Sequence, residues 1–112
     1  MVEIYFRTRK LKKACSEEKE IKKRLGEELS KKLQQRMMEL QAAGSLADIS
    51  YIPPARCHEL SGNRAGQFSV DLKHPYRLLF IPTVTPVPRM KDGGIDRTRI
   101  TSIEIIDIID TH

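Results

Sequence analysis

Hydrophobic and polar positions follow two different periods in the first half of the chain. Between residues 2 and 7, Ile4 and Phe6 fall on one side and Tyr5 on the other, which predicts a short strand. Farther along, hydrophobic residues recur at every fourth position, namely Ile21, Leu25, Leu29, Leu33 and Met37. On a straight helix, residues at this spacing shift around the axis by about 40° per step, so the five positions would not share one face. We therefore expect two helices, at 16–25 and 27–43, with a break at Gly26.

Capping residues suggest where these helices begin and end. Ser16 is followed by two glutamates, an order typical of a helix N-terminus, because the hydroxyl accepts a backbone N–H and the acids suit the helix dipole. Gly44 fits the C-terminal stop of the second helix. Residues 45–56 then form a connector, since the Pro53-Pro54 pair is compatible with neither a helix nor a central strand.

The second half of the chain has the pattern of strands. Residues 67–72 alternate between hydrophobic and polar side chains, which predicts a half-buried strand. A tight connection at His74-Pro75 leads to a second hydrophobic run at 76–81. The segment 82–99 is rich in proline and glycine, so we expect it to be a long, irregular excursion.

The last predicted strand covers residues 100–109. Its alternation slips between Ile105 and Ile106, which predicts either a bulge or a strand that is buried on both faces. The order strand, two helices and then strands predicts an α+β fold, with the helices on one face of a mainly antiparallel sheet. We expect residues 1–112 to form a single domain.

Composition narrows the class of protein. With 39% hydrophobic and 31% charged residues among 112, the chain is typical of a soluble globular domain, and no hydrophobic run approaches the ~20 residues of a membrane span. Two cysteines do not make a disulfide framework, and no signal peptide is evident, so we expect a cytoplasmic protein. The net charge of +5 favours acidic or polyanionic partners, although basic helices are often simply solvated.

The chain contains the parts that metal-free RNA cleavage needs. Histidine can remove the proton of a ribose 2′-OH or protonate the leaving 5′-oxygen, and arginine can stabilise the crowded phosphate. His58 and His112 lie at the edges of predicted strands. Arg64 precedes one strand and Arg77 lies early in the next. Without further information, these four could equally be ordinary surface residues.

Two segments resemble a known family. Residues 57–80 (CHELSGNRAGQFSVDLKHPYRLLF) and 103–112 (IEIIDIIDTH) are similar to the HigB-like branch of the RelE/ParE toxin superfamily of type II toxin–antitoxin systems. The shared pattern is a histidine, Gly-x-Arg-x-Gly, an alternating strand, an aromatic-Arg strand and a terminal Asp-x-His. The order and spacing of these elements make the resemblance specific over about a third of the chain.

The resemblance implies a RelE-like fold and a metal-independent, cofactor-free mRNA endonuclease that acts in the ribosomal A site. Its partner would be a small helix-turn-helix antitoxin similar to HigA. The implied catalytic residues are His58, His112, Arg64 and Arg77, and which histidine is the base stays open. We also expect Ser61, Asn63, Arg97, Arg99 and Thr111 to bind RNA; Arg97 and Arg99 belong to the 82–99 excursion and would add positive charge.

Two departures from the family pattern leave other functions open. Ser61 stands where active members commonly carry lysine, and Thr111 where they carry tyrosine. Both changes should weaken phosphate stabilisation or substrate positioning. The alternatives are a gyrase-poisoning toxin similar to ParE, against which both histidines speak, and a degenerate protein that only binds its antitoxin.

Two other kinds of site are less consistent with the sequence. A thiolate activated by a neighbouring histidine at Cys57-His58 is awkward, because adjacent residues of an extended chain point to opposite faces. Metal ligation by Glu104, Asp110 and His112 requires all three on one face of the last strand, which the slip at Ile105 argues against.

Overall fold

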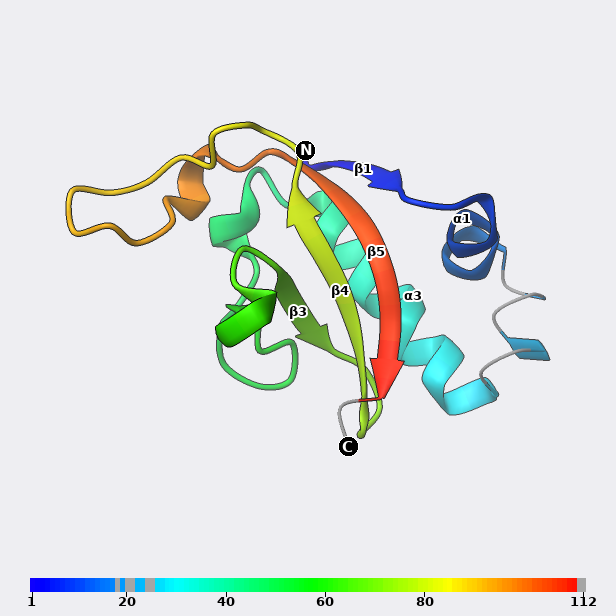
Figure 1. The fold of residues 1–112 in the computed structure, drawn as a ribbon. Helices are drawn as coiled ribbons and strands as arrows, with labels where there is room; N and C mark the ends of the chain where they lie inside the picture. The colour runs from blue at the N-terminus through cyan, green and yellow to red at the C-terminus, as the bar shows by residue number, and fades with distance from the viewer. Residues whose placement is uncertain (18, 20–21, 24–25, 111–112) are drawn as a thin grey trace.

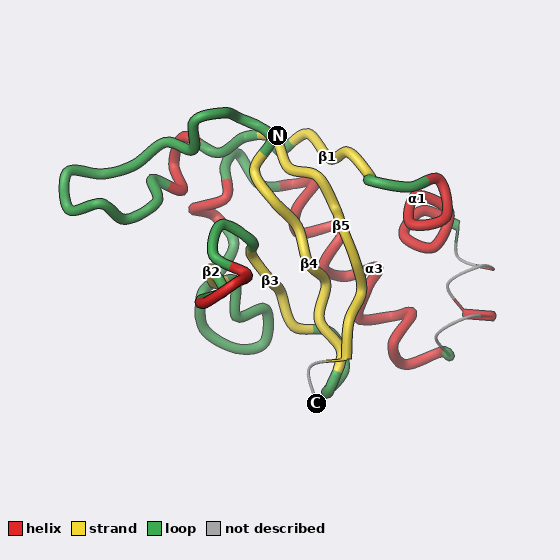
Figure 2. The backbone as a smooth tube through the Cα atoms, viewed as in Figure 1, coloured by secondary structure: helices red, strands yellow, loops and turns green. Residues whose placement is uncertain are grey.

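The computed structural model has a five-stranded sheet with helices on one of its faces (Figures 1 and 2). It describes residues 1–17, 19, 22–23 and 26–110. The main elements are β1 (Glu3–Phe6), α1 (Arg9–Ser16), α3 (Glu27–Ala42), β2 (His58–Glu59), β3 (Phe68–Asp71), β4 (Tyr76–Pro82) and β5 (Ser102–Asp110). Short 3-10 turns lie at Leu46–Asp48, Gly62–Arg64 and Arg97–Arg99. The α+β class expected from the sequence is confirmed.

The sheet has the strand order β1-β5-β4-β3-β2. The pairs β2–β3, β3–β4 and β4–β5 are antiparallel, whereas β1 lies parallel to β5, so the sheet is mixed. β5 is therefore an inner strand, which explains its run of isoleucines. The predicted strands at 2–7, 67–72, 76–81 and 100–109 are confirmed to within two residues, while β2 was not predicted.

A β-bulge interrupts β5 where the alternation of its sequence slips. Leu79 pairs with Asp107 but Phe80 pairs with Ile105, so Ile106 is the extra residue. Before the bulge, Ile103 and Ile105 are fully buried, and after it Ile108 packs against the same core. The slip therefore reports a bulge, which keeps isoleucine side chains on the core face along the whole strand.

The core lies between α3 and the sheet, as Figure 1 shows. From α3, the buried residues Leu29, Leu33, Met37 and Leu40 recur at helical spacing. From the sheet, the rings of Phe68 and Phe80 stack with centroids 5.8 Å apart and an interplanar angle of 12°. Of the hydrophobic repeat in the sequence, Leu29, Leu33 and Met37 therefore pack in the core. The other two members, Ile21 and Leu25, lie outside the described residues.

A helix that was not predicted, α1, precedes the predicted helix at 16–25. α1 starts after Thr8, whose Oγ1 accepts the backbone N–H of Leu11 at 3.1 Å. Ser16 is the last residue of α1 and not the cap of a following helix, so that prediction is wrong. The physical reason is that Ala14 and Cys15, near the end of α1, are buried, which keeps the chain helical through Ser16.

The break at Gly26 is confirmed. Gly26 precedes α3 with φ +81°, a conformation that residues with a Cβ rarely adopt. α3 then ends at Ala42, one residue before the predicted end, and Gly44 follows it. The residues Lys19, Lys22 and Lys23, just before the break, also have helical backbone geometry.

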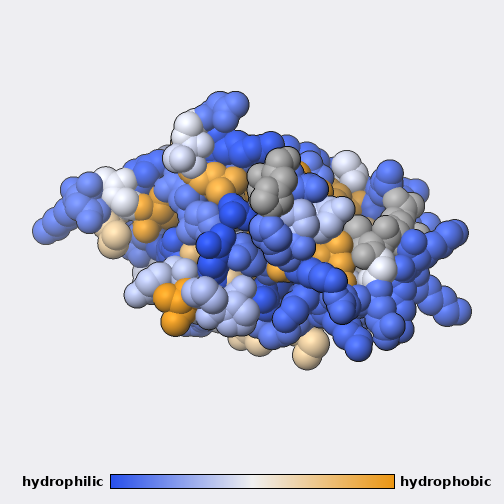
Figure 3. Space-filling view, turned by 90° about the horizontal axis from the view of Figure 1, so that it is seen from below, coloured by the Kyte–Doolittle hydropathy of each residue, from blue (hydrophilic) through white to orange (hydrophobic). Residues whose placement is uncertain are grey.

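The 82–99 excursion projects from one end of the sheet (Figure 1). Its two arms meet at a single bridge between Arg89 and Ile95, and a turn at Arg97–Arg99 leads into β5. Seen from below, the surface is mostly hydrophilic, with small separate hydrophobic patches (Figure 3). None of the helices in the described ranges is both long and apolar enough to cross a bilayer.

Candidate active site

His58 lies on β2, at the edge of the sheet. It pairs with Ser69 of β3, which in turn pairs with Leu79 of β4. Side chains directly opposite one another share a face, and Phe68 and Val70 point to the α3 side, so His58 and Ser69 point away from α3. We call this the site face. Asp71 and Arg77 are also paired; Asp71 lies two residues after Ser69 and Arg77 two residues before Leu79, so they share the site face.

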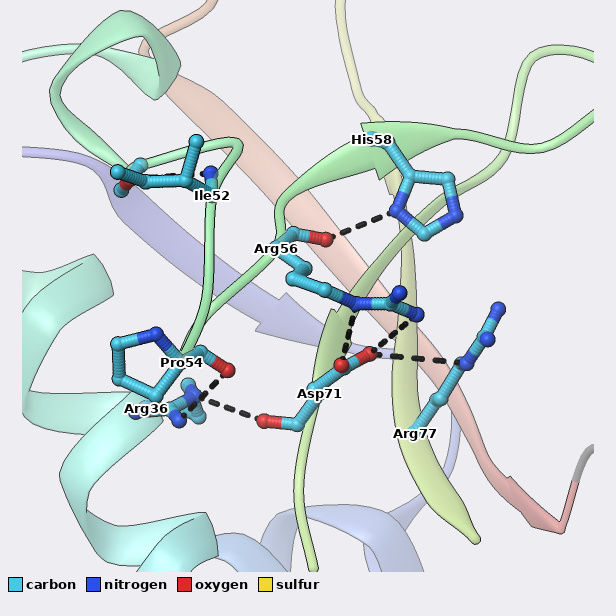
Figure 4. A network of polar contacts seen from close by, with 8 residues as sticks. Arg36, Ile52, Pro54, Arg56, His58, Asp71 and Arg77 are labelled. Atoms are coloured by element: carbon cyan, nitrogen blue, oxygen red, sulfur yellow. Dashed lines mark hydrogen bonds and ion pairs between the residues drawn. The ribbon is translucent and has the colours of Figure 1, made fainter. Parts of the chain in front are cut away.

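The local backbone orients the His58 ring (Figure 4). Its Nδ1 lies 2.8 Å from the backbone carbonyl oxygen of Arg56. Because a carbonyl oxygen can only accept, Nδ1 must carry the proton. In the neutral ring, Nε2 therefore has the free lone pair, which suits a general base, and in the charged ring it can donate, which suits a general acid. The side chain is half-buried.

Next to His58, one carboxylate lies between two guanidinium groups (Figure 4). The Asp71 Oδ2 is 2.6 Å from Arg56 Nε, and its Oδ1 is 3.4 Å from Arg56 Nη2. On the other side, Arg77 Nε lies 3.6 Å from Asp71 Oδ1. Two cations and one anion leave a formal charge of +1 beside the imidazole, which suits a phosphodiester.

Arg56 and Asp71 are site residues that the sequence reasoning missed. The signal for Asp71 was available, because the predicted antiparallel strands place it opposite Arg77. The signal for Arg56 was weaker, since it lies in the connector before β2. Arg56 has φ +47°, which is uncommon for a residue with a Cβ. The residue with this unusual backbone conformation is the one whose carbonyl oxygen bonds His58 Nδ1.

A buried arginine supports this cluster from the core side. The Arg36 side chain is 2% exposed, and its Nε donates to the Asp71 carbonyl oxygen at 2.7 Å. Its Nη2 donates to the Pro54 carbonyl oxygen at 3.1 Å, and Nη1 bonds Glu39. Arg36 thus joins α3 to the connector and to β3 through its bonds with Pro54 and Asp71 (Figure 4).

The glycine-flanked loop presents its residues to solvent. Ser61, Asn63 and Arg64 are all exposed. The Arg64 Nη1 donates to Gln67 Oε1 at 3.2 Å, within the loop. Within the described ranges, no hydrogen bond or ion pair links Arg64 to His58, Asp71 or Arg77. Of the predicted catalytic arginines, the structure places Arg77 in the cluster around Asp71, while Arg64 stands on the neighbouring loop.

The two arginines of the last 3-10 turn differ in their surroundings. Arg97 Nη1 donates to the Cys57 carbonyl oxygen at 3.0 Å, and its guanidinium lies 5.5 Å from the centroid of Phe68. Since Phe68 faces the core, Arg97 and the His58 ring lie on different sides of β3. Arg97 therefore covers the edge of the core, whereas Arg99 is exposed and available to a partner.

The predicted residues His112 and Thr111 lie outside the described residues. The last described residue, Asp110, pairs with Tyr76, next to Arg77 on β4. β5 and β2 are three strands apart, which corresponds to ~14 Å at the usual strand spacing. A working pair of His58 and His112 therefore requires the chain to cross the site face over Arg77 after it leaves β5.

Neither of the other kinds of site is favoured by the geometry. Cys57 is fully buried, and burial raises the pKa of its thiol to about 11, while the nearby Arg97 charge lowers it slightly. The bulge at Ile106 places Glu104 and Asp110 on opposite faces of β5. Within the described part of the chain, no group of three or more histidine, cysteine and acidic residues could hold a metal ion.

No protein-family model matches this chain, and a search of the curated proteins finds no match. The function is therefore argued from the geometry of the site face together with the resemblance of the two sequence segments. Of the implied catalytic residues, that geometry includes His58, Arg77 and, on the adjoining loop, Arg64.

Proposed function

We propose that this protein is the toxin of a type II toxin–antitoxin system, with a RelE-like fold and the activity of a metal-independent, ribosome-dependent mRNA endonuclease. One observation carries the proposal. The His58 ring is held through Nδ1 and has no partner at Nε2 among the described residues, and it lies on the same sheet face as Asp71 and Arg77, with Arg56 paired to Asp71. An oriented imidazole beside a net positive cluster is what phosphodiester cleavage without metal requires.

The proposed chemistry is attack by the ribose 2′-OH on the adjacent phosphorus. A bond forms between O2′ and phosphorus, and the bond between phosphorus and O5′ breaks, which leaves a cyclic phosphate and a 5′-OH end. His58 Nε2 performs one of the two proton transfers, and we assign the other to His112. Arg77 and Arg64 stabilise the negative charge that builds up on the phosphate oxygens.

The proposed partners follow from charge and from the resemblance. The net charge of +5 suits mRNA in the ribosomal A site and an acidic segment of a HigA-like helix-turn-helix antitoxin. A cytoplasmic location is part of the same proposal, because ribosomes are the site of action. A small helix-turn-helix protein encoded in the neighbouring reading frame would support the antitoxin.

Ser61 favours one alternative. It is an exposed hydroxyl at a position where active members commonly carry lysine, so the site face lacks that cation. A degenerate protein that binds its antitoxin without cleaving RNA is the second candidate. A gyrase poison similar to ParE is a third outcome that the same experiment separates.

The test is to induce wild-type protein and a His58→Ala variant in cells and to map the 5′ ends of mRNA. Cuts phased with the reading frame in the wild type, lost in the variant, support the endonuclease. Met38→Ala, on the exposed side of α3, is the matched control and should cut like wild type. Growth arrest with intact mRNA and trapped gyrase would support the poison, and no phenotype would support the degenerate protein.

A further inference from the structure

We propose that Arg56 and Arg77 form a phosphate subsite, and that the Asp71 carboxylate occupies this subsite until a phosphate displaces it. Arg56 is thereby a phosphate-binding residue in addition to Arg77. The geometry alone carries the subsite; that its phosphate belongs to an RNA backbone rests on the proposed function.

The Asp71 carboxylate is held as an oxyanion would be. Arg56 approaches it side-on, with Nε 2.6 Å from Oδ2 and Nη2 3.4 Å from Oδ1. Arg77 adds Nε at 3.6 Å from Oδ1. The planar fork of arginine matches two oxygens of a phosphate as well as two oxygens of a carboxylate. The Asp71 oxygens therefore mark positions that phosphate oxygens can take.

The carboxylate can leave without disturbing the strand. Asp71 is anchored through its backbone: its N–H donates to the Ala55 carbonyl oxygen at 2.7 Å, and its own carbonyl oxygen accepts Arg36 Nε at 2.7 Å. Its side chain is 25% exposed, and the two arginines are 40% and 26% exposed. Rotation about the Cα–Cβ bond of Asp71 thus frees both guanidinium groups while β3 keeps its hydrogen bonds.

The subsite also has access to water and positive charge. A cavity of about 50 Å³ is lined by Arg56, Asp71 and Arg77 together with residues 72 and 74–76. This exceeds the roughly 10–15 Å³ that one water needs. With Asp71 turned aside, two positive charges face the entering group, and both are partly shielded from solvent.

Arg56 connects this subsite to the imidazole. Its side chain binds the oxyanion, and its backbone carbonyl oxygen holds His58 Nδ1 at 2.8 Å. Figure 4 shows both contacts of Arg56, so a single residue would set the position of a bound phosphate relative to the His58 ring. Displacement of Asp71 would bring a scissile phosphate to the side of His58, for the proton transfer that we assign to Nε2.

The test uses binding rather than cleavage. Fluorescence anisotropy would measure the Kd of a short single-stranded RNA with 2′-O-methyl riboses, which cannot be cut, and a parallel titration would use inorganic phosphate. Asp71→Asn removes the competing charge at constant shape, so RNA binding should tighten by up to about fivefold. The slope of log Kd against log salt should steepen by about 0.7, as for one more phosphate contact.

Asp107→Asn is the matched control, because it removes the same charge on the site face of β5, where, among the described residues, Asp107 forms no ion pair with either arginine. Equal tightening in both variants would overturn the subsite, since only the overall charge would matter. Unchanged or weaker binding of both RNA and phosphate in Asp71→Asn would also overturn it. Arg56→Lys keeps the charge but loses the fork, so it should weaken binding, and unchanged binding in this variant would count against the subsite.

The two probes separate the subsite from the proposed function. Tighter binding of both RNA and phosphate in Asp71→Asn supports the subsite with an RNA ligand. Tighter binding of phosphate alone supports the subsite and contradicts the endonuclease. Phased mRNA cuts by the wild type, combined with no effect of Asp71→Asn on either probe, support the endonuclease and overturn the subsite.

Discussion

The guanidinium Nε of Arg36 donates to the backbone carbonyl oxygen of Asp71 at 2.7 Å, so a cation buried in α3 fixes the strand whose side chain faces the candidate site. The same guanidinium holds Pro54 in the connector that precedes β2. The core side and the site face of the sheet are thus linked through one side chain. Loss of the Arg36 guanidinium should therefore lower the stability of the fold directly and disturb the candidate site indirectly.

Arg36→Met keeps much of the side-chain volume but removes every donor. The carbonyl oxygens of Asp71 and Pro54 would lose their partners in a buried place, so the free energy of unfolding should fall by about 2–4 kcal/mol. Urea unfolding would measure this. Arg89→Met is the control, because Arg89 also donates to a carbonyl oxygen, that of Gly93, but is exposed; it should change stability by less than about 0.5 kcal/mol.

Arg97 and Arg99 should separate a structural role from a binding role. Arg97→Ala removes a hydrogen bond to the Cys57 carbonyl oxygen and the contact with Phe68, and it should cost about 1–2 kcal/mol of stability. Arg99→Ala should leave the thermal midpoint unchanged and, if this turn binds RNA, weaken RNA binding. Equal thermal midpoints for the two variants would contradict the structural role of Arg97.

Gly26 should resist substitution for conformational reasons alone. A Cβ built there meets no atom within 4 Å, but the φ of +81° is one that side-chain-bearing residues avoid. Gly26→Ala should therefore lower stability by about 1–3 kcal/mol in thermal or urea unfolding. Gly44→Ala, where φ is ordinary and the nearest atom is the Asp48 carboxylate at 3.2 Å, should cost clearly less.

The buried thiols should make stability fall at high pH. Burial raises the pKa of Cys57 from the ordinary value of 9.0 to about 11, and that of Cys15 likewise to about 11. Between these two values the unfolded chain has lost the thiol protons and the folded chain keeps them, so stability decreases as pH rises from about 9 to 11. Cys57→Ala should show a smaller decrease in urea unfolding over this range, and an identical decrease would exclude this cause.

The two histidines should act as a unit. In a ribosome-dependent cleavage assay, His58→Ala and His112→Ala should each lower the rate by about 10²–10⁴-fold. The double variant should lose little more than either single variant, because removing one of two coupled proton transfers already disables the step. Full activity of His112→Ala would show that another group performs the second transfer.

Sequence patterns predicted the fold wherever a single local interaction dominates. The slip at Ile105 located the bulge, and Gly26 located the break before α3, because each reflects the geometry of a few neighbouring residues. α1 was missed, because Ser16 with its glutamates resembles a cap as well as Thr8 does, and only the burial of Ala14 and Cys15 shows that the chain is still part of α1 at Ser16.

The candidate site was harder to predict because its contacts are long-range. His58 and Arg77 were identified from the sequence, and the structure places both on the site face. The pairing of Arg56 with Asp71 depends on how the connector turns, which no periodicity reports. The burial of Arg36 was likewise hidden, since an arginine within a basic helix is expected to point to solvent.

The parallel pairing of β1 with β5 has a kinetic consequence. Residue 3 lies opposite residue 102, so the sheet is completed only when segments from almost opposite ends of the chain meet. Closing so long a loop is entropically costly, and few stabilising contacts form until the last strand inserts. The sheet should therefore assemble slowly from the β3–β4 hairpin outward, with β1 the last strand to join.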